Sequence, residues 1–133
     1  MGTLVNEPGL RQLNQVFMNI LANAIDALEE SLVTDNGLIT NNRGKICIHT
    51  ILTKDKQVMI GIVDNGLGIP EDVQQRLFEP FFTTKPVGKG TGLGLSISYQ
   101  IITQKHQGKL QCISTVGQGT EFVIIIPLNQ RSL

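Results

Sequence analysis

The sequence predicts an α+β protein in which helices cover one face of a largely antiparallel sheet, a two-layer sandwich. Two observations carry this prediction. Apolar residues recur at three- and four-residue steps in two segments, and runs rich in β-branched residues occur as two adjacent pairs. Strands joined by short turns pair antiparallel, and amphipathic helices need a sheet face on which to bury their apolar stripes. A chain of 133 residues fits one domain, 1–133.

The first half of the chain predicts a long helix followed by a hairpin. Apolar side chains recur along residues 9–31, and neither Gly nor Pro occurs after Gly9 in this range. The polar segment 33–44 contains Asn-Gly and Arg-Gly pairs and predicts a loop. Two β-branched runs joined by three polar residues then predict an antiparallel strand pair over 45–53 and 57–64. The apolar face of the helix comprises Leu10, Leu13, Phe17, Ile20, Leu21, Ala24 and Leu28.

The second half predicts a short helix, an irregular stretch, a second long helix and a second strand pair. A glycine-rich turn spans 65–70, and its final proline suits the start of a helix over 71–77. Two prolines and two glycines make 80–91 irregular. An amphipathic pattern returns over 92–107. The last two predicted strands are 109–114 and 121–127.

Composition excludes several kinds of protein. The chain has 11 Lys+Arg and 11 Asp+Glu, and aromatic residues make up 5%, so a general nucleic-acid surface is not expected. No apolar run approaches the roughly 18 residues of a membrane span, and the first residues lack the features of a signal peptide, so we expect a cytoplasmic domain. Cys47 and Cys112 lie in apolar runs and are expected to be reduced core residues.

Polar residues form a stripe along the first predicted helix. At about 100° per residue, Gln15, Asn19, Asn23, Asp26 and Glu30 fall within about 80° of one another, opposite the apolar face. Two Asn side chains one turn apart offer carbonyl oxygens, which suit Mg²⁺. The alternative is the ordinary solvated stripe of an amphipathic helix. Asn is a poor helix former, however, so two on one face in the middle of a helix favour a function.

An acidic residue ends the second predicted strand, within the segment Asp64–Pro70 (DNGLGIP). A carboxylate there can accept a hydrogen bond from the exocyclic amine of adenine, whereas guanine presents an oxygen at that position. Gly66 and Gly68 allow the backbone to approach a flat ring without a Cβ in the way. The alternative is an ordinary Asp-Asn-Gly turn between a strand and a helix.

Glycines alternate with other residues over Gly88–Gly94 and lead directly into the second long helix. The bare N–H groups at the start of a helix form an anion site, and a triphosphate would suit it. The segment is not a Walker A loop, because the chain contains no Gly-Lys-Ser/Thr, and the strict alternation does not match a dinucleotide fingerprint. The alternative is a flexible linker.

Three of the five phenylalanines lie within Leu77–Lys85 (LFEPFFTTK), beside this glycine-rich segment. They are expected to form either a small satellite core or the aromatic anchor of a lid that closes over a nucleotide. In the second case Lys85 and Lys89 are cations that can approach the β- and γ-phosphates.

In order along the chain, QVFMNILANAIDALEE, DNGLGIP, LFEPFFTTK and GTGLGLSIS resemble the N, G1, F and G2 boxes of sensor histidine kinases. The resemblance covers residues 12–128 and is to the catalytic ATP-binding domain. It implies the Bergerat fold shared with gyrase, heat-shock chaperone and mismatch-repair ATPases. That fold has a mixed, mostly antiparallel sheet of about five strands, with about three helices on one face.

The resemblance also implies roles for individual residues. Asn23 would coordinate Mg²⁺ with Asn19 assisting, Asp64 would bind the adenine amino group, and Thr120 would support Asp64 directly or through water. Asp26 departs from the pattern, because a Lys is frequent at that position in relatives. Asn19, Asn23 and Lys85 are the expected catalytic residues. The other expected ATP-binding residues are Gly66, Gly68, Ile69, Phe82, Gly88, Gly90, Thr91, Gly92, Leu93, Gly94 and Leu95.

The residue at position 19 bears on the reaction. Relatives that hydrolyse ATP or phosphorylate serine usually carry a Glu there, which removes a proton from water or a hydroxyl. A histidine acceptor needs less help, since imidazole has a pKa of about 6.5 and is mostly neutral at pH 7. Asn19 therefore favours a histidine kinase over an ATPase or a serine kinase.

The phosphoacceptor is expected on a different domain. Family members carry it in a helical hairpin within a His-Glu/Asp-rich box, and neither His49 nor His106 lies in such a box. We therefore expect a monomeric domain that takes ATP or ADP, acts on the histidine-containing domain of a homodimeric parent and reaches a response regulator only indirectly. Two alternatives to the histidine kinase domain remain: an ATPase or serine kinase of the same fold, and a non-catalytic interaction module.

Overall fold

The computed structural model describes residues 7–33, 44–85 and 92–128. None of the helices in these ranges is long and apolar enough to cross a membrane. The elements are helix α1 (Glu7–Val33), strands β1 (Ile46–Leu52) and β2 (Gln57–Asp64), helices α2 (Glu71–Gln74) and α3 (Gly94–Gln100), the π-helical turn η1 (Ile101–Lys105), and strands β3 (Lys109–Thr115) and β4 (Gly119–Pro127).

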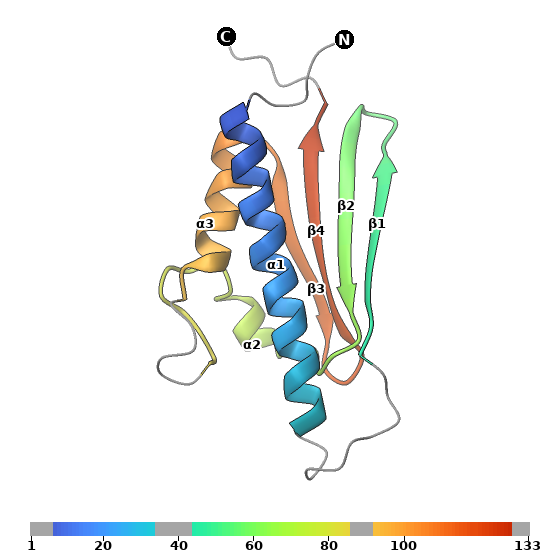
Figure 1. The fold of residues 1–133 in the computed structure, drawn as a ribbon, viewed down its shortest axis with the longest axis vertical. Helices are drawn as coiled ribbons and strands as arrows, with labels where there is room; N and C mark the ends of the chain where they lie inside the picture. The colour runs from blue at the N-terminus through green and yellow to red at the C-terminus, as the bar shows by residue number, and fades with distance from the viewer. Residues whose placement is uncertain (1–6, 34–43, 86–91, 129–133) are drawn as a thin grey trace.

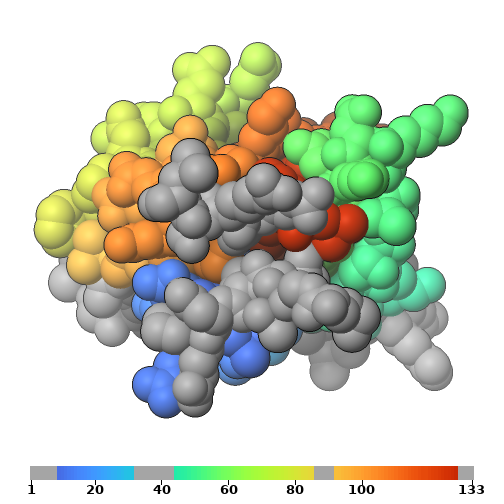
Figure 2. Space-filling view, turned by 90° about the horizontal axis from the view of Figure 1, so that it is seen from above, coloured from blue at the N-terminus to red at the C-terminus, as the bar shows by residue number. Residues whose placement is uncertain are grey.

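The elements form two layers, as predicted. The sheet has strand order β1-β2-β4-β3 with every neighbouring pair antiparallel, and α1 and α3 lie side by side on one face (Figure 1). Viewed down the long axis of the molecule, α2 (yellow-green) and α3 (orange) lie on the opposite side from the β1–β2 hairpin (green) (Figure 2). The described residues contain four strands and no parallel pair, so the expected mixed sheet of about five strands is not reproduced within them.

The core lies between α1, the α3–η1 segment and the inner face of the sheet. Ile20 of α1, Ile102 of η1 and Ile124 of β4 are 0% exposed. Burying such a side chain contributes about 1.5–3 kcal/mol to stability. Leu10 was expected on the same face but is 54% exposed, because it lies about 80° around the helix from Ile20, at the edge of the apolar stripe.

Removing one buried side chain of this core should be costly. Ile20→Ala is expected to lower the free energy of unfolding by about 3 kcal/mol, because it leaves a cavity under α1. Ile51→Ala, at a side chain that is 52% exposed on β1, should cost less than about 1 kcal/mol. Urea denaturation followed by circular dichroism measures both values, and equal losses would contradict this view of the core.

The second long helix differs from its prediction over 92–107. It is α-helical only over Gly94–Gln100 and then widens into the π turn η1, where the His106 N–H donates to Ile101 O at 3.2 Å. The wider turn buries Ile101 and Ile102 next to each other in the sequence. The short helix α2 ends at Gln74 rather than at residue 77.

One cysteine prediction is wrong. Cys112 is half-buried on the inner face of β3, but Cys47 is exposed, because strand alternation turns it to the helix-free face of the sheet. His49 lies on that same face and pairs with Glu121 at 2.6 Å, across Gly61. His106 is 2% exposed. Both histidines therefore occupy the structural or surface positions expected of them.

Candidate nucleotide site

A cavity of about 750 Å³ opens between α1 and the end of the sheet where β2 stops. It is lined by five parts of the chain: α1, the segment from the end of β2 into α2, the stretch after α2, the start of α3, and the β3–β4 hairpin. The first four each contain one of the motifs singled out in the sequence. The lining residues include Asn19, Asn23, Asp26, Asp64, Leu67, Gly68, Ile69, Val73, Phe82, Lys85, Gly92, Gly94, Leu95, Thr120 and Phe122.

Asp64 forms one end of the cavity, at the last position of β2. It is 4% exposed, and its Oδ1 accepts a hydrogen bond from the Gly66 N–H at 2.9 Å. Burial raises the pKa of the Asp64 carboxyl, although hydrogen bonds from the backbone of Gly66 and Thr120 oppose the shift. Since a carboxylate accepts about four hydrogen bonds, Asp64 retains capacity for a donor on a ligand.

Side chains that no sequence motif indicated hold the loop after β2 in place. Ser114 Oγ accepts from the Ile69 N–H at 2.8 Å and lies 2.8 Å from Thr120 Oγ1. Gln74 Nε2 donates to Ile69 O at 2.7 Å and to Ser114 O at 3.1 Å. The Thr120 hydroxyl therefore contacts Ser114, and its support of Asp64 comes from the backbone.

Two glycines of this loop have different surroundings. Gly68 has φ +79°, and an added Cβ would lie 2.3 Å from Thr115 O, so the backbone of β3 runs against it. Gly66 donates to Asp64, and its α-carbon faces Ala27 O of α1, which an added Cβ would meet at 3.0 Å. Gly68 lines the cavity, whereas Gly66 packs the loop onto α1.

Substitution of Gly68 should deform the loop and reduce nucleotide affinity. Gly68→Ala combines an unfavourable backbone conformation with the collision at Thr115, so we expect a stability loss of more than about 2 kcal/mol and weaker ADP binding. Gly117→Ala is the matched control, because Gly117 also has positive φ but has no atom within 4 Å of an added Cβ. The Gly117→Ala variant should lose only about 1 kcal/mol of stability. Thermal unfolding of both variants tests this difference in stability, and ADP titration of Gly68→Ala tests the loss of affinity.

Asn19 ties α1 to the start of α3. Its Nδ2 donates to Gly94 O and to Ser98 Oγ, each at 3.2 Å. Ser98 Oγ donates its own hydrogen to Gly94 O at 2.8 Å, so it must accept from Asn19. Both amide hydrogens of Asn19 are thereby engaged, and its carbonyl oxygen is the atom available to a ligand in the cavity.

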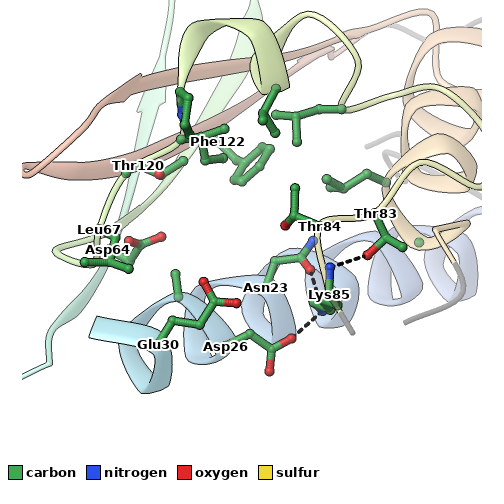
Figure 3. Close-up of a pocket in the computed structure, with 18 of the residues that line it drawn as sticks. Asn23, Asp26, Glu30, Asp64, Leu67, Thr83, Thr84, Lys85, Thr120 and Phe122 are labelled. Carbon is green, nitrogen blue, oxygen red and sulfur yellow. Dashed lines mark hydrogen bonds and ion pairs between the residues drawn. The ribbon is translucent and has the colours of Figure 1, made fainter. Parts of the chain in front are cut away.

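Asn23 and Asp26 meet Lys85 at the end of the cavity away from Asp64 (Figure 3). Lys85 Nζ forms an ion pair with Asp26 and lies 3.4 Å from Asn23 Oδ1. Among the described residues, no group of three or more His, Cys, Asp or Glu side chains could hold a metal ion. The uncharged oxygen of Asn23 fits Mg²⁺, which takes few protein ligands and keeps waters or phosphate oxygens.

The phenylalanine segment contributes one ring to the core and another to the cavity, and most of the glycine-rich segment expected to form a lid lies outside the described residues. Phe78 stacks on Tyr99 with ring centroids 4.9 Å apart and packs against the core, whereas Phe82 lines the cavity beneath the Arg76 guanidinium, 4.5 Å from the ring centre. The Phe81 N–H donates to Gly92 O at 2.8 Å. Gly92 has φ +71°, and an added Cβ would lie 2.4 Å from the Phe81 carbonyl carbon, so no larger residue fits there.

Most of the expected site residues that the structure describes line this one cavity. The exceptions are Gly66, which packs on α1, and Leu93, which precedes α3 without facing the cavity. Three expected ATP-binding residues, Gly88, Gly90 and Thr91, lie outside the described ranges. The same holds for Lys89, the second cation expected near the phosphates, and for most of the predicted loop 33–44.

Comparison with known proteins assigns the chain to a family. Residues 10–130 match the family described as histidine kinase-, DNA gyrase B-, and HSP90-like ATPase. The chain is 44% identical over 119 residues to the signal transduction histidine-protein kinase AtoS of Escherichia coli (strain K12), covering 90% of this chain and 17% of AtoS. It is 40% identical over 121 residues to sporulation kinase E of Bacillus subtilis (strain 168), covering 91% of this chain and 14% of that kinase. The chain thus spans less than a fifth of either relative.

Solved structures agree with this assignment. The nucleotide-free catalytic domain of histidine kinase ThkA superimposes with a TM-score of 0.70 at 34% identity, over 90% of this chain and 69% of that one. Full-length ShkA in complex with AMPPNP superimposes with a TM-score of 0.72 at 25% identity, over 96% of this chain and 23% of that one. The chain therefore belongs to the histidine kinase-, DNA gyrase B- and HSP90-like ATPase family, as a catalytic ATP-binding domain of the sensor histidine kinase type.

Proposed function

We propose that this domain binds Mg²⁺-ATP in the cavity and presents the γ-phosphate to a histidine on a separate dimerisation and phosphoacceptor domain. The observation that carries the proposal is the convergence of all four motif segments on one cavity, with a buried carboxylate at one end and an Asn–Asp–Lys cluster at the other. A molecule with an amine-bearing ring and a distant polyanion matches that polarity.

Adenine would lie at the Asp64 end. The carboxylate accepts a hydrogen bond from the exocyclic amine, while Gly68 allows the ring to approach the backbone. Ile69, Phe82 and Leu95 supply apolar contacts around the ring or sugar. Guanine presents an acceptor to the Asp64 acceptor, so the pocket should discriminate against it.

The phosphates would extend toward α1 and the start of α3. Gly92 and Gly94 place backbone groups at the N-terminus of α3, which favours an anion. Asn23 would hold Mg²⁺, with Asn19 contributing its carbonyl oxygen, and the metal would neutralise charge on the β- and γ-phosphates. Lys85 supplies a second positive charge beside Asn23.

Transfer would then depend on positioning rather than on a protein base. A neutral imidazole nitrogen of the acceptor forms the new P–N bond, the bond from the γ-phosphorus to the bridging oxygen breaks, and ADP leaves with the electron pair. The attacking nitrogen carries no proton, so the uncharged Asn19 suffices at the position where a Glu base would otherwise act.

The acceptor and the wider assembly are proposals drawn from the family. We propose that the isolated domain is a monomer, that the parent kinase is a homodimer, and that a response regulator receives the phosphoryl group only after the acceptor histidine. We also propose a cytoplasmic location, where ATP is available.

The state of the cysteines is compatible with such a reducing compartment. Both described cysteines are free, and burial together with the nearby Asp64 raises the pKa of the Cys112 thiol to about 11.

Calorimetric titration with ADP, with and without Mg²⁺, tests the binding proposal. We expect one site whose affinity rises with the metal, little heat with GDP, and only slow ATP hydrolysis by the isolated domain. Absence of heat at millimolar ADP, which corresponds to binding weaker than about −4 kcal/mol, would favour a non-catalytic interaction module. Sustained hydrolysis at several turnovers per minute would favour an ATPase instead.

A further inference from the structure

The carboxylate of Asp26 faces the part of the cavity assigned above to phosphates. Asp26 follows Asn23 by three residues on α1 and lines the cavity, with 40% of its side chain exposed. A negative charge at that place repels phosphate unless it is compensated.

The compensating charge comes from a distant segment. Lys85, which is 59 residues further along the chain, forms an ion pair with Asp26. The same ammonium lies 3.4 Å from Asn23 Oδ1, so the two α1 side chains hold it from two directions (Figure 3). The Lys85 side chain is 26% exposed, less than in a typical surface ion pair, so solvent and salt weaken the attraction less.

The backbone near Lys85 also favours this placement. The Lys85 N–H donates to Thr83 Oγ1 at 3.0 Å, which closes a local turn and directs the lysine toward α1. Thr83 and Thr84 line the cavity beside it. Lys85 is thus held at both ends: its backbone by the turn with Thr83, and its ammonium by the Asp26 carboxylate.

We propose that Asp26 is a positioning residue. It holds the Lys85 ammonium beside Asn23, and from there the ammonium binds the terminal phosphate of ATP. Lys85 supplies a positive charge beside α1, and Asp26 fixes its position. This inference rests on the proposed function, because it concerns the phosphate end of the same cavity. Asp26 acts through Lys85 and touches no substrate atom.

Mg²⁺-ATP affinity in a double-mutant cycle tests the proposal. Lys85→Met should weaken binding about tenfold, since it removes a charged hydrogen bond to phosphate, and Asp26→Asn about fivefold, since it releases Lys85. The Asp26→Asn/Lys85→Met double variant should lose no more than Lys85→Met alone. Asp26→Glu should stay within about twofold of wild type, because it restores the ion pair. Glu29→Gln, an exposed carboxylate on the same helix away from the cavity, is the charge-matched control.

Each of the following outcomes would overturn the proposal. Tighter ATP binding by Asp26→Asn would mean that the carboxylate only repels phosphate, and additive losses in the double variant would mean that the two side chains act separately. A higher Mg²⁺ requirement in Asp26→Asn together with a lower one in Lys85→Met would make Asp26 a metal ligand and Lys85 its competitor.

The wild-type titration separates this inference from the proposed function. If the wild-type chain fails to bind Mg²⁺-ATP, the nucleotide site itself is wrong. If the wild-type chain binds and Asp26→Asn binds equally well, only the role of Asp26 is wrong. Thermal unfolding of each variant verifies that the fold is retained, as expected for two partly exposed side chains.

Discussion

Replacing Asp64 by Asn should lower the affinity for ADP by about 100-fold or more, equivalent to about 3 kcal/mol, while leaving the fold intact. The Asn oxygen can still accept the Gly66 N–H, which Asp64 Oδ1 accepts at 2.9 Å. The side-chain amide then presents a donor to the adenine amine, which is also a donor. Calorimetry with ADP measures the loss, and wild-type affinity in this variant would show that adenine is not bound at Asp64.

The same substitution should stabilise the ligand-free protein at neutral pH. Burial raises the pKa of the Asp64 carboxyl, so the folded state holds a proton more tightly than the unfolded state, whose pKa is about 3.9. The stability that this carboxyl contributes is therefore complete below pH about 3.9 and is lost as pH rises through the raised folded-state value.

Thermal unfolding from pH 4 to pH 8 measures this effect. The wild-type melting temperature should fall relative to that of Asp64→Asn as pH rises, because only the wild-type carboxyl ionises. Asp55→Asn, at an exposed position between β1 and β2, should leave both the melting profile and ADP affinity unchanged. Parallel profiles for wild type and Asp64→Asn would contradict the assignment of this buried carboxyl.

The second large effect is expected at Asn23. Asn23→Ala should remove most of the increase in ADP affinity that Mg²⁺ produces, roughly tenfold, and change metal-free binding little. The reason is that Asn23 offers the α1 oxygen at the Lys85 end of the cavity. Titrations with Mg²⁺ and with a chelator separate the two contributions.

Asn14→Ala provides the matched control for this experiment, since Asn14 is an exposed asparagine on the same helix that does not line the cavity. It should behave as wild type under both conditions. An equal loss for Asn23→Ala with and without Mg²⁺ would assign Asn23 to the nucleotide rather than to the metal.

Local patterns predicted much of this fold. The β-branched runs predicted β2 over Gln57–Asp64 with the bounds that the structure has, and the periodicity of α1 predicted that Ile20 and Ala24 face the core. The four motifs each carry their chemistry within a few adjacent residues, so the sequence also indicated which segments line the cavity. The sequence predicts Asp64, Gly68 and Lys85 as site residues, and all three line the cavity.

What the sequence did not reveal depends on contacts between distant residues. Ser114 is a small polar residue in a strand, and only the pairing of β3 with β4 and the folding of the loop after β2 bring it to Thr120 and Ile69. The Asp26–Lys85 ion pair joins residues that no periodicity relates. Cys47 was expected in the core because its neighbours are apolar, but β1 is an edge strand whose outer face has no helix over it.

The central claim is that the four motif segments form one adenine nucleotide site. The most direct test is a map of backbone amide chemical shifts during titration of the labelled chain with Mg²⁺-ADP. The predicted result is that the largest changes fall on Asn23, Gly66, Gly68, Lys85 and Gly94, from all four segments, and saturate with one affinity. Changes concentrated instead on the helix-free face of the sheet, at Cys47, Ile51 and Ile125, would contradict the claim.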